Sequence, residues 1–115
     1  MDASPASPPA KLKDLSAPEA LSLLAANPAL RIVDVRTPAE FHAGHIEGAL
    51  LAPLGKTAHS VDGWPVTTPI LLVCHSGHRS HVAGTQLLRL GFQDVSHIAG
   101  GMIAWKRSGA PLTRE

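Results

Sequence analysis

The chain has 115 residues, which is the length of one domain and is enough to bury a hydrophobic core without disulfides or metals. It carries one cysteine and a formal net charge of +1, and no stretch approaches the roughly 18 apolar residues of a membrane span. These features exclude an internal disulfide and argue against binding to nucleic acid or insertion into a membrane. No secretory signal is visible, so we expect a soluble, cytoplasmic protein.

The chain begins with MDASPASPPA, a segment rich in proline, alanine and serine that shows no hydrophobic periodicity. It predicts a disordered leader over residues 1–10, followed by a single domain over residues 11–115. The next segment, residues 16–27, opens with Ser16 and has Glu19 three positions later. This spacing is a capping box, and it predicts a helix that ends at the Asn-Pro pair.

Short apolar and β-branched stretches predict four strands, at residues 31–35, 49–54, 70–73 and 95–98. Capping residues, apolar periodicity and terminal glycines predict helices after three of these strands, at residues 37–44, 80–90 and 102–107. Residues 56–68 are weakly patterned and predict a loop with at most one helical turn. The alternation of strands and helices predicts an α/β fold around a mostly parallel sheet.

The single cysteine follows the strand at residues 70–73 and opens the segment CHSGHRS. In an open parallel sheet the ligand site lies beyond the carboxyl ends of the strands, which is where this segment falls. The chain then turns at Gly77 and enters a helix near Ser80, so successive amide hydrogens can converge on the sulfur at the positive end of the helix. Such a cradle favours a thiolate over a neutral thiol. An inert core cysteine would require neither the turn nor Arg79.

The surroundings of this cysteine favour anions. Residues 63–93 contain no aspartate or glutamate, but they contain Arg79, Arg89 and the three histidines His75, His78 and His81. A surface with this charge pattern attracts small anions. Histidine changes charge between pH 5 and 8, so part of the attraction depends on pH.

Four motifs occur in the order in which rhodanese-like sulfurtransferases carry them. They are DVR at residues 34–36, Glu40 with GHIEGA at residues 44–49, CHSGHRS at residues 74–80, and GGMIAWKRSGAPL at residues 100–112. The resemblance covers about nine-tenths of the chain and leaves out the leader. The chain therefore resembles the rhodanese-like domain family, and in particular its single-domain thiosulfate sulfurtransferases.

The resemblance implies a three-layer fold, with a mostly parallel five-stranded sheet flanked by helices. It also implies that Cys74 accepts a sulfane sulfur from a small anionic donor such as thiosulfate, forms a persulfide, and passes the sulfur to cyanide, a thiol or a protein acceptor. By this resemblance Cys74 and Arg79 are catalytic, and no cofactor or metal is expected. The substrate-binding residues would be the rest of the loop, namely His75, Ser76, Gly77, His78 and Ser80.

Three alternatives remain open. The first is a sulfur-carrier or partner-binding module of the same fold with little turnover. The second is a cysteine phosphatase, a class that resembles this loop but has five residues between its cysteine and arginine, whereas four separate Cys74 from Arg79. The third is a structural zinc site built from Cys74, His75, His78 and His81. His75 and His78 stand where the family often has arginine or another polar residue, so their contribution to substrate binding is also open.

Several other polar residues have local structural interpretations. Asp34, Arg36 and Glu40 predict a salt bridge that ties a strand to the following helix. His45 is expected to be a hydrogen-bonded structural histidine, and Trp105 is expected to cover the core at the edge of the sheet.

Overall fold

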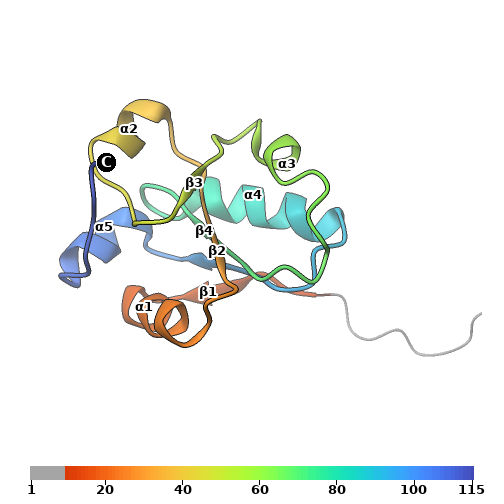
Figure 1. The fold of residues 1–115 in the computed structure, drawn as a ribbon, viewed down its shortest axis with the longest axis horizontal. Coiled ribbons are helices and arrows are strands. Elements are labelled where there is room, and N and C mark those ends of the chain that lie inside the picture. The colour runs from red at the N-terminus through yellow and green to blue at the C-terminus, as the bar shows by residue number, and fades with distance from the viewer. Residues whose placement is uncertain (1–9) are drawn as a thin grey trace, which may run out of the picture.

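The structure is a computed structural model that describes residues 10–115 (Figure 1). Apart from Ala10, the predicted leader lies outside the described residues. Five strands form one parallel sheet in the order β1-β5-β4-β2-β3. The strands are β1 (Lys13–Leu15), β2 (Arg31–Asp34), β3 (Leu50–Leu51), β4 (Ile70–Val73) and β5 (Val95–Ile98). The helices are α1 (Ala17–Ala26), α2 (Pro38–His42), α3 (Thr57–Ser60), α4 (His78–Arg89) and α5 (Gly101–Arg107).

Helices cover both faces of the sheet, which gives the three layers that the family resemblance implies (Figure 1). Because side chains alternate between the two faces of a strand, neighbouring residues of β4 enter different clusters. Leu72 belongs to the buried cluster that includes Leu87 of α4. Leu71 belongs to the opposite cluster, which includes Ala20 of α1 and Trp105 of α5. The prediction of an α/β fold with a central parallel sheet is confirmed.

The predicted capping boxes are present at the start of α1 and α2. Ser16 Oγ accepts a hydrogen bond from Glu19 N at 3.2 Å, and Glu19 Oε1 accepts one from Ser16 N at 2.8 Å. Thr37 and Glu40 make the same reciprocal pair. Each box supplies partners for backbone groups that have none within the helix.

Some element boundaries differ from the predictions. Strand β3 covers only two of the six residues expected, and α3 is the single helical turn allowed for residues 56–68. Helix α4 begins at His78, two residues earlier than predicted, because Gly77 adopts φ 104° and serves as the N-cap. The short edge strand β1 was not predicted. Among residues 10–115, none of the helices has the length and hydropathy to cross a bilayer.

The parallel arrangement brings two loops together at one edge of the sheet. Strand β4 is fully buried and leads into Cys74, while β5 leads into the turn that begins α5. Met102 N of α5 donates a hydrogen bond to Cys74 O at 2.8 Å, and Ile103 N donates one to His75 O at 3.1 Å. The backbone after β4 is therefore fixed by the first turn of α5.

Candidate active site

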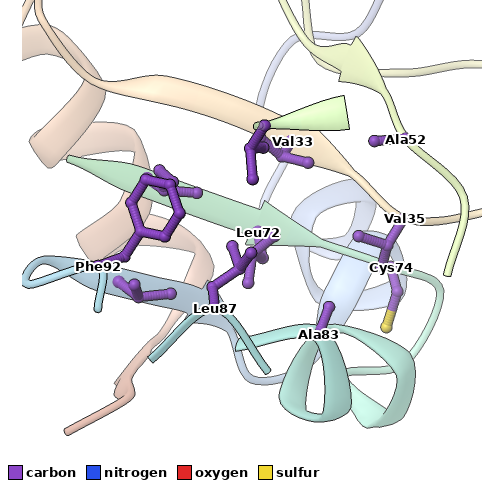
Figure 2. Close-up of a cluster of buried hydrophobic side chains, with 11 residues drawn as sticks. Val33, Val35, Ala52, Leu72, Cys74, Ala83, Leu87 and Phe92 are labelled. Atoms are coloured by element: carbon purple, nitrogen blue, oxygen red, sulfur yellow. The ribbon is translucent and has the colours of Figure 1, made fainter. Parts of the chain in front are cut away.

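The sulfur of Cys74 lies at the positive end of helix α4. Cys74 is 1% exposed, and its Sγ accepts hydrogen bonds from Gly77 N at 3.1 Å and Ser80 N at 3.3 Å. These amides belong to the N-cap and the third residue of α4, where backbone N–H groups have no partner within the helix. Gly77 has no side chain to cap them, so the sulfur takes that place. Figure 2 shows Cys74 at one end of a buried cluster, with its sulfur directed towards α4.

Two glycines allow the Cys74 loop and the β5–α5 turn to pack closely. Gly77 has φ 104° and Gly101 has φ 61°, a backbone region that favours glycine. A Cβ atom on Gly77 would overlap the carbonyl of Ala99, and one on Gly101 would overlap the backbone of His75. The shape of the sulfur cradle therefore depends on two positions without side chains.

A chain of buried polar groups leads away from the sulfur. Ser80 Oγ lies 3.4 Å from Cys74 Sγ and 2.8 Å from His97 Nδ1, and His97 Nε2 lies 2.7 Å from Asp14 Oδ1. Ser80 and His97 are 0% and 3% exposed, whereas the side chain of Asp14 is 69% exposed. Neither His97 nor Asp14 was among the site residues predicted from the sequence. The available signal was the pair of polar residues, Ser96 and His97, inside a strand that is buried along its whole length.

Arg79 directs its guanidinium group to Glu40 rather than to the sulfur. The two nitrogens Nη1 and Nη2 each lie 2.7 Å from a different carboxylate oxygen of Glu40. Hydrogen bonding to Arg79 lowers the pKa of Glu40 from 4.5 to about 2. The same hydrogen bonds raise the pKa of Arg79, and negative charge on Glu40 and Cys74 adds to this effect. Arg79 is thus close enough to contribute positive potential at Cys74 while its own charge is paired.

The predicted local salt bridge is correct for two of its three residues. Arg36 and Asp34 form a buried pair, with Nη2 to Oδ2 at 2.8 Å. The prediction that Glu40 joins them is wrong. Arg36 Nη2 also donates to Gly44 O at 2.8 Å, so its guanidinium is already engaged, and Glu40 instead faces Arg79 of α4.

The remaining predicted loop residues lie at the surface. His75, Ser76 and His78 are exposed, whereas Cys74 itself is buried. Of the seven site residues that we predicted, the structure gathers Cys74, Gly77 and Ser80 at the sulfur. Arg79 stands beside them, and the other three form the exposed part of the loop.

Structural roles are confirmed for two other residues. His45 is buried, its Nδ1 lies 2.8 Å from Phe41 O, and its ring stacks on Phe41 at a centroid distance of 3.7 Å. Trp105 is 1% exposed, and its Nε1 donates to Pro111 O at 2.8 Å. Within the described part of the chain, no three His, Cys, Asp or Glu side chains are grouped closely enough to hold a metal ion.

A cavity of about 610 Å³ lies away from Cys74, between α1, the edge strand β1 and the neighbouring strand β5. Its lining includes Leu15, Leu23 and Leu30, and most of the exposed area inside it is apolar. It contains no residue of the CHSGHRS loop. The candidate active site is therefore identified by Cys74 and the amides that donate to its sulfur, and this cavity is not part of it.

Comparison with known proteins agrees with this geometry. The family model described as "Rhodanese-like domain" matches residues 16–108. A sulfurtransferase of Allochromatium vinosum is 37% identical over 81 residues, which cover 70% of this chain and 76% of that protein. The thiosulfate sulfurtransferase GlpE of Pseudoalteromonas translucida is 36% identical over 75 residues, which cover 65% and 71%.

Solved structures lead to the same family. The rhodanese-like domain of the Alr3790 protein from Anabaena superposes with a TM-score of 0.82 at 28% sequence identity. The match covers 90% of this chain and 80% of that domain. Because the family model spans most of the chain and the solved domain shares its fold, the chain belongs to the rhodanese-like domain family.

Proposed function

We propose that this protein is a sulfurtransferase that carries a sulfane sulfur on Cys74. In the first step the Cys74 thiolate attacks the outer sulfur of a donor such as thiosulfate. A new S–S bond forms, the donor S–S bond breaks, and sulfite leaves with the bonding electrons. In the second step cyanide or a thiolate attacks the outer sulfur of the persulfide, and the Cys74 thiolate leaves. Covalent catalysis of this kind replaces one transfer between two solutes by two displacements at a fixed group.

The observation that carries the proposal is the convergence of two backbone amides on Cys74 Sγ at the start of α4. Hydrogen bonds from N–H groups and the helix dipole favour negative charge on the sulfur. This favours both steps, because the thiolate is the attacking form in the first step and the leaving group in the second. In this proposal Arg79 adds positive potential and, through Glu40, anchors the start of α4 to α2.

The exposed part of the loop is the proposed entry point for the donor. His75, Ser76 and His78 are exposed residues of the loop that follows Cys74, so a small anion can reach them. Protonated histidines there would attract thiosulfate, which carries two negative charges. The two relatives described above are named as sulfurtransferases, which supports the same reaction class.

The experiment is a steady-state assay of sulfur transfer from thiosulfate to cyanide with wild type and Cys74→Ser. Serine offers an oxygen to the same amides but does not ionise usefully at neutral pH, so we expect less than about a tenth of wild-type turnover. Circular dichroism and urea unfolding establish that the variant is folded. Turnover close to the wild-type value in Cys74→Ser would rule out Cys74 as the sulfur acceptor.

The same assay separates an enzyme from a sulfur carrier of the same fold. A carrier releases about one thiocyanate per chain, because it forms the persulfide without repeated turnover. An enzyme releases many thiocyanate molecules per chain.

A separate assay distinguishes a cysteine phosphatase, which would hydrolyse aryl phosphates faster than it transfers sulfur. The spacing of four residues between Cys74 and Arg79 does not favour phosphatase activity.

A further inference from the structure

We propose that Ser80, His97 and Asp14 form a proton relay that takes the proton of the Cys74 thiol and makes the thiolate available at neutral pH. This inference deepens the proposed sulfur transfer and rests on it, because it concerns how the nucleophile is ionised. His97 acts on Cys74 through Ser80 and touches neither donor nor acceptor. It is therefore a positioning residue that also holds a proton.

The geometry forms an unbroken path from the sulfur to the surface. The successive distances are 3.4 Å from Cys74 Sγ to Ser80 Oγ, 2.8 Å from Ser80 Oγ to His97 Nδ1, and 2.7 Å from His97 Nε2 to Asp14 Oδ1. The two middle groups are buried, and only Asp14 at the end of the path is well exposed. Burying an imidazole costs desolvation free energy that an apolar residue at the same position would avoid. His97 hydrogen-bonds both the Ser80 hydroxyl and the Asp14 carboxylate, so a role in proton transfer would explain why a histidine is buried there.

Hydrogen-bond chemistry gives the direction of transfer. The Asp14 carboxylate only accepts hydrogen bonds, so His97 Nε2 carries a proton and Nδ1 of the neutral ring is an acceptor. The Ser80 hydroxyl has two acceptors within reach, His97 Nδ1 at 2.8 Å and Gly77 O at 3.2 Å, and in the relay it donates to the nearer one. The Cys74 thiol then donates to Ser80 Oγ. On transfer, the S–H bond breaks and its electrons stay on sulfur. The thiol proton moves to Ser80 Oγ while the former hydroxyl proton moves to His97 Nδ1. The products are a thiolate and an imidazolium, and the net charge of the group is unchanged.

Most of the charges near the relay favour the imidazolium and the thiolate. The Asp14 carboxylate of β1 pairs with the imidazolium. The His81 ring of α4 lies at a centroid distance of 5.8 Å from His97, and a protonated His81 would oppose positive charge on His97. The residue of β4 in register with His97 is the apolar Leu72. On the sulfur side, the amides of Gly77 and Ser80 receive the thiolate, and Arg79, paired with Glu40, adds positive potential.

The composition of the chain allows a direct test without a donor or a reagent. Thiolates absorb ultraviolet light, and the chain has one cysteine and no tyrosine, so the change in thiolate absorbance with pH comes from Cys74 alone. We would titrate wild type, His97→Asn and Asp14→Asn, with Cys74→Ser as the baseline. The Asn amide at position 97 can still accept from Ser80 but takes up no proton. Asp94→Asn is the matched control, because Asp94 is a carboxylate that pairs with Lys13, the β1 neighbour of Asp14, at 2.9 Å and is not part of the path.

The proposal expects the midpoint of thiolate formation to rise by about one pH unit in His97→Asn and by about half a unit in Asp14→Asn, since each change removes support for the charged pair. Asp94→Asn should stay within about 0.2 unit of wild type. Should His97→Asn fail to fold, the exposed Asp14→Asn decides the question. Midpoints of Asp14→Asn and His97→Asn that coincide with wild type would overturn the relay, even if wild type transfers sulfur. Shifted midpoints in a protein that transfers no sulfur would uphold the relay and refute the proposed function.

Discussion

Cys74 combines a structural contact with a proposed chemical role. The sulfur that would receive the sulfane sulfur also accepts hydrogen bonds from Gly77 N and Ser80 N, which are among the first amides of α4. A change in the hydrogen bonding of the sulfur is therefore coupled to the start of this helix. Serine at this position keeps an acceptor for the amides, whereas alanine would leave two buried donors unpaired. Serine is for this reason the informative substitution for catalysis.

Gly77 supports the first stability prediction. Gly77→Ala forces a left-handed backbone on alanine and drives its Cβ into the Ala99 carbonyl, so we expect a loss of about 3 kcal/mol or more in the free energy of unfolding. Gly109→Ala is the matched control, because φ there is also positive, 79°, and open space surrounds the position. The control should lose only about 1 kcal/mol. Equal losses in urea unfolding would contradict the close packing of the two loops.

The two exposed histidines of the loop support a prediction about donor binding. Replacing His75 and His78 with arginine should keep kcat/KM for thiosulfate high above pH 7, because arginine stays charged where histidine does not. Replacing both with glutamine should raise KM more than it lowers kcat, most clearly near pH 6. The assay runs from about pH 5 to pH 9 at fixed ionic strength, since salt screens exposed charges. Superimposable profiles for the three proteins would make these histidines bystanders.

At the scale of the residue, the sequence predicted the part of the site that is local. Cys74, Gly77 and Ser80 lie within one short segment, so the strand, turn and helix that surround them bring them together. Asp14 and His97 are 83 residues apart, and they meet only because β1 pairs with β5. Glu40 and Arg79 are 39 residues apart. Their pairing depends on the way α2 faces α4, which no local pattern encodes.

At the scale of the element, the Glu40–Arg79 pair joins α2 to the first turn of α4. Its two hydrogen bonds of 2.7 Å match the planar fork of the guanidinium to the carboxylate. Both side chains are about a third exposed, at 31% and 29%, so water screens the pair and reduces its contribution to stability. Because the pKa of Glu40 is lowered, the contribution of this ion pair to stability nevertheless depends on pH.

The pH dependence follows from the direction of that shift. Because the pKa of Glu40 falls from 4.5 to about 2 in the folded protein, the carboxylate stabilises the fold above pH 4.5 and the stabilisation is lost as the pH falls towards 2. Glu40→Gln should therefore lower the free energy of unfolding by about 1 kcal/mol at pH 7, and the difference from wild type should shrink between pH 4.5 and pH 2. Denaturant unfolding at several pH values measures this. Glu47→Gln, at an exposed glutamate, should show no such convergence. A constant difference for Glu40→Gln across the range would contradict the assignment.

The elements that the sequence predicted well are those with local signals. The capping boxes at Ser16 and Thr37 locate the starts of α1 and α2, and the fully apolar run of β4 identifies a central strand. Strand β1 has three residues and only one of them, Leu15, is apolar, so it shows no alternation that a sequence pattern could detect. Its strand character comes from pairing with β5, a long-range contact. Strand β3, at the opposite edge of the sheet, is also short, because only Leu50 and Leu51 pair with β2.

At the scale of the whole molecule, the parallel sheet determines where the chemistry lies. All four strand pairings are parallel, so the carboxyl ends of the strands share one edge, and the Cys74 loop and the first turn of α5 meet there. The alternation of strands and helices was sufficient to predict this class of fold. The strand order β1-β5-β4-β2-β3 was not predictable from local patterns, because it depends on which faces of the helices pack together.

The most direct test of the account is intact-mass spectrometry of the protein after incubation with thiosulfate. We predict a mass gain of about 32 Da, one sulfur atom, which disappears after addition of cyanide and is absent in Cys74→Ser. Cys74 is the single cysteine of the chain, so no other thiol can account for the gain. An unchanged mass in wild type, or an equal gain in Cys74→Ser, would contradict sulfur transfer through Cys74.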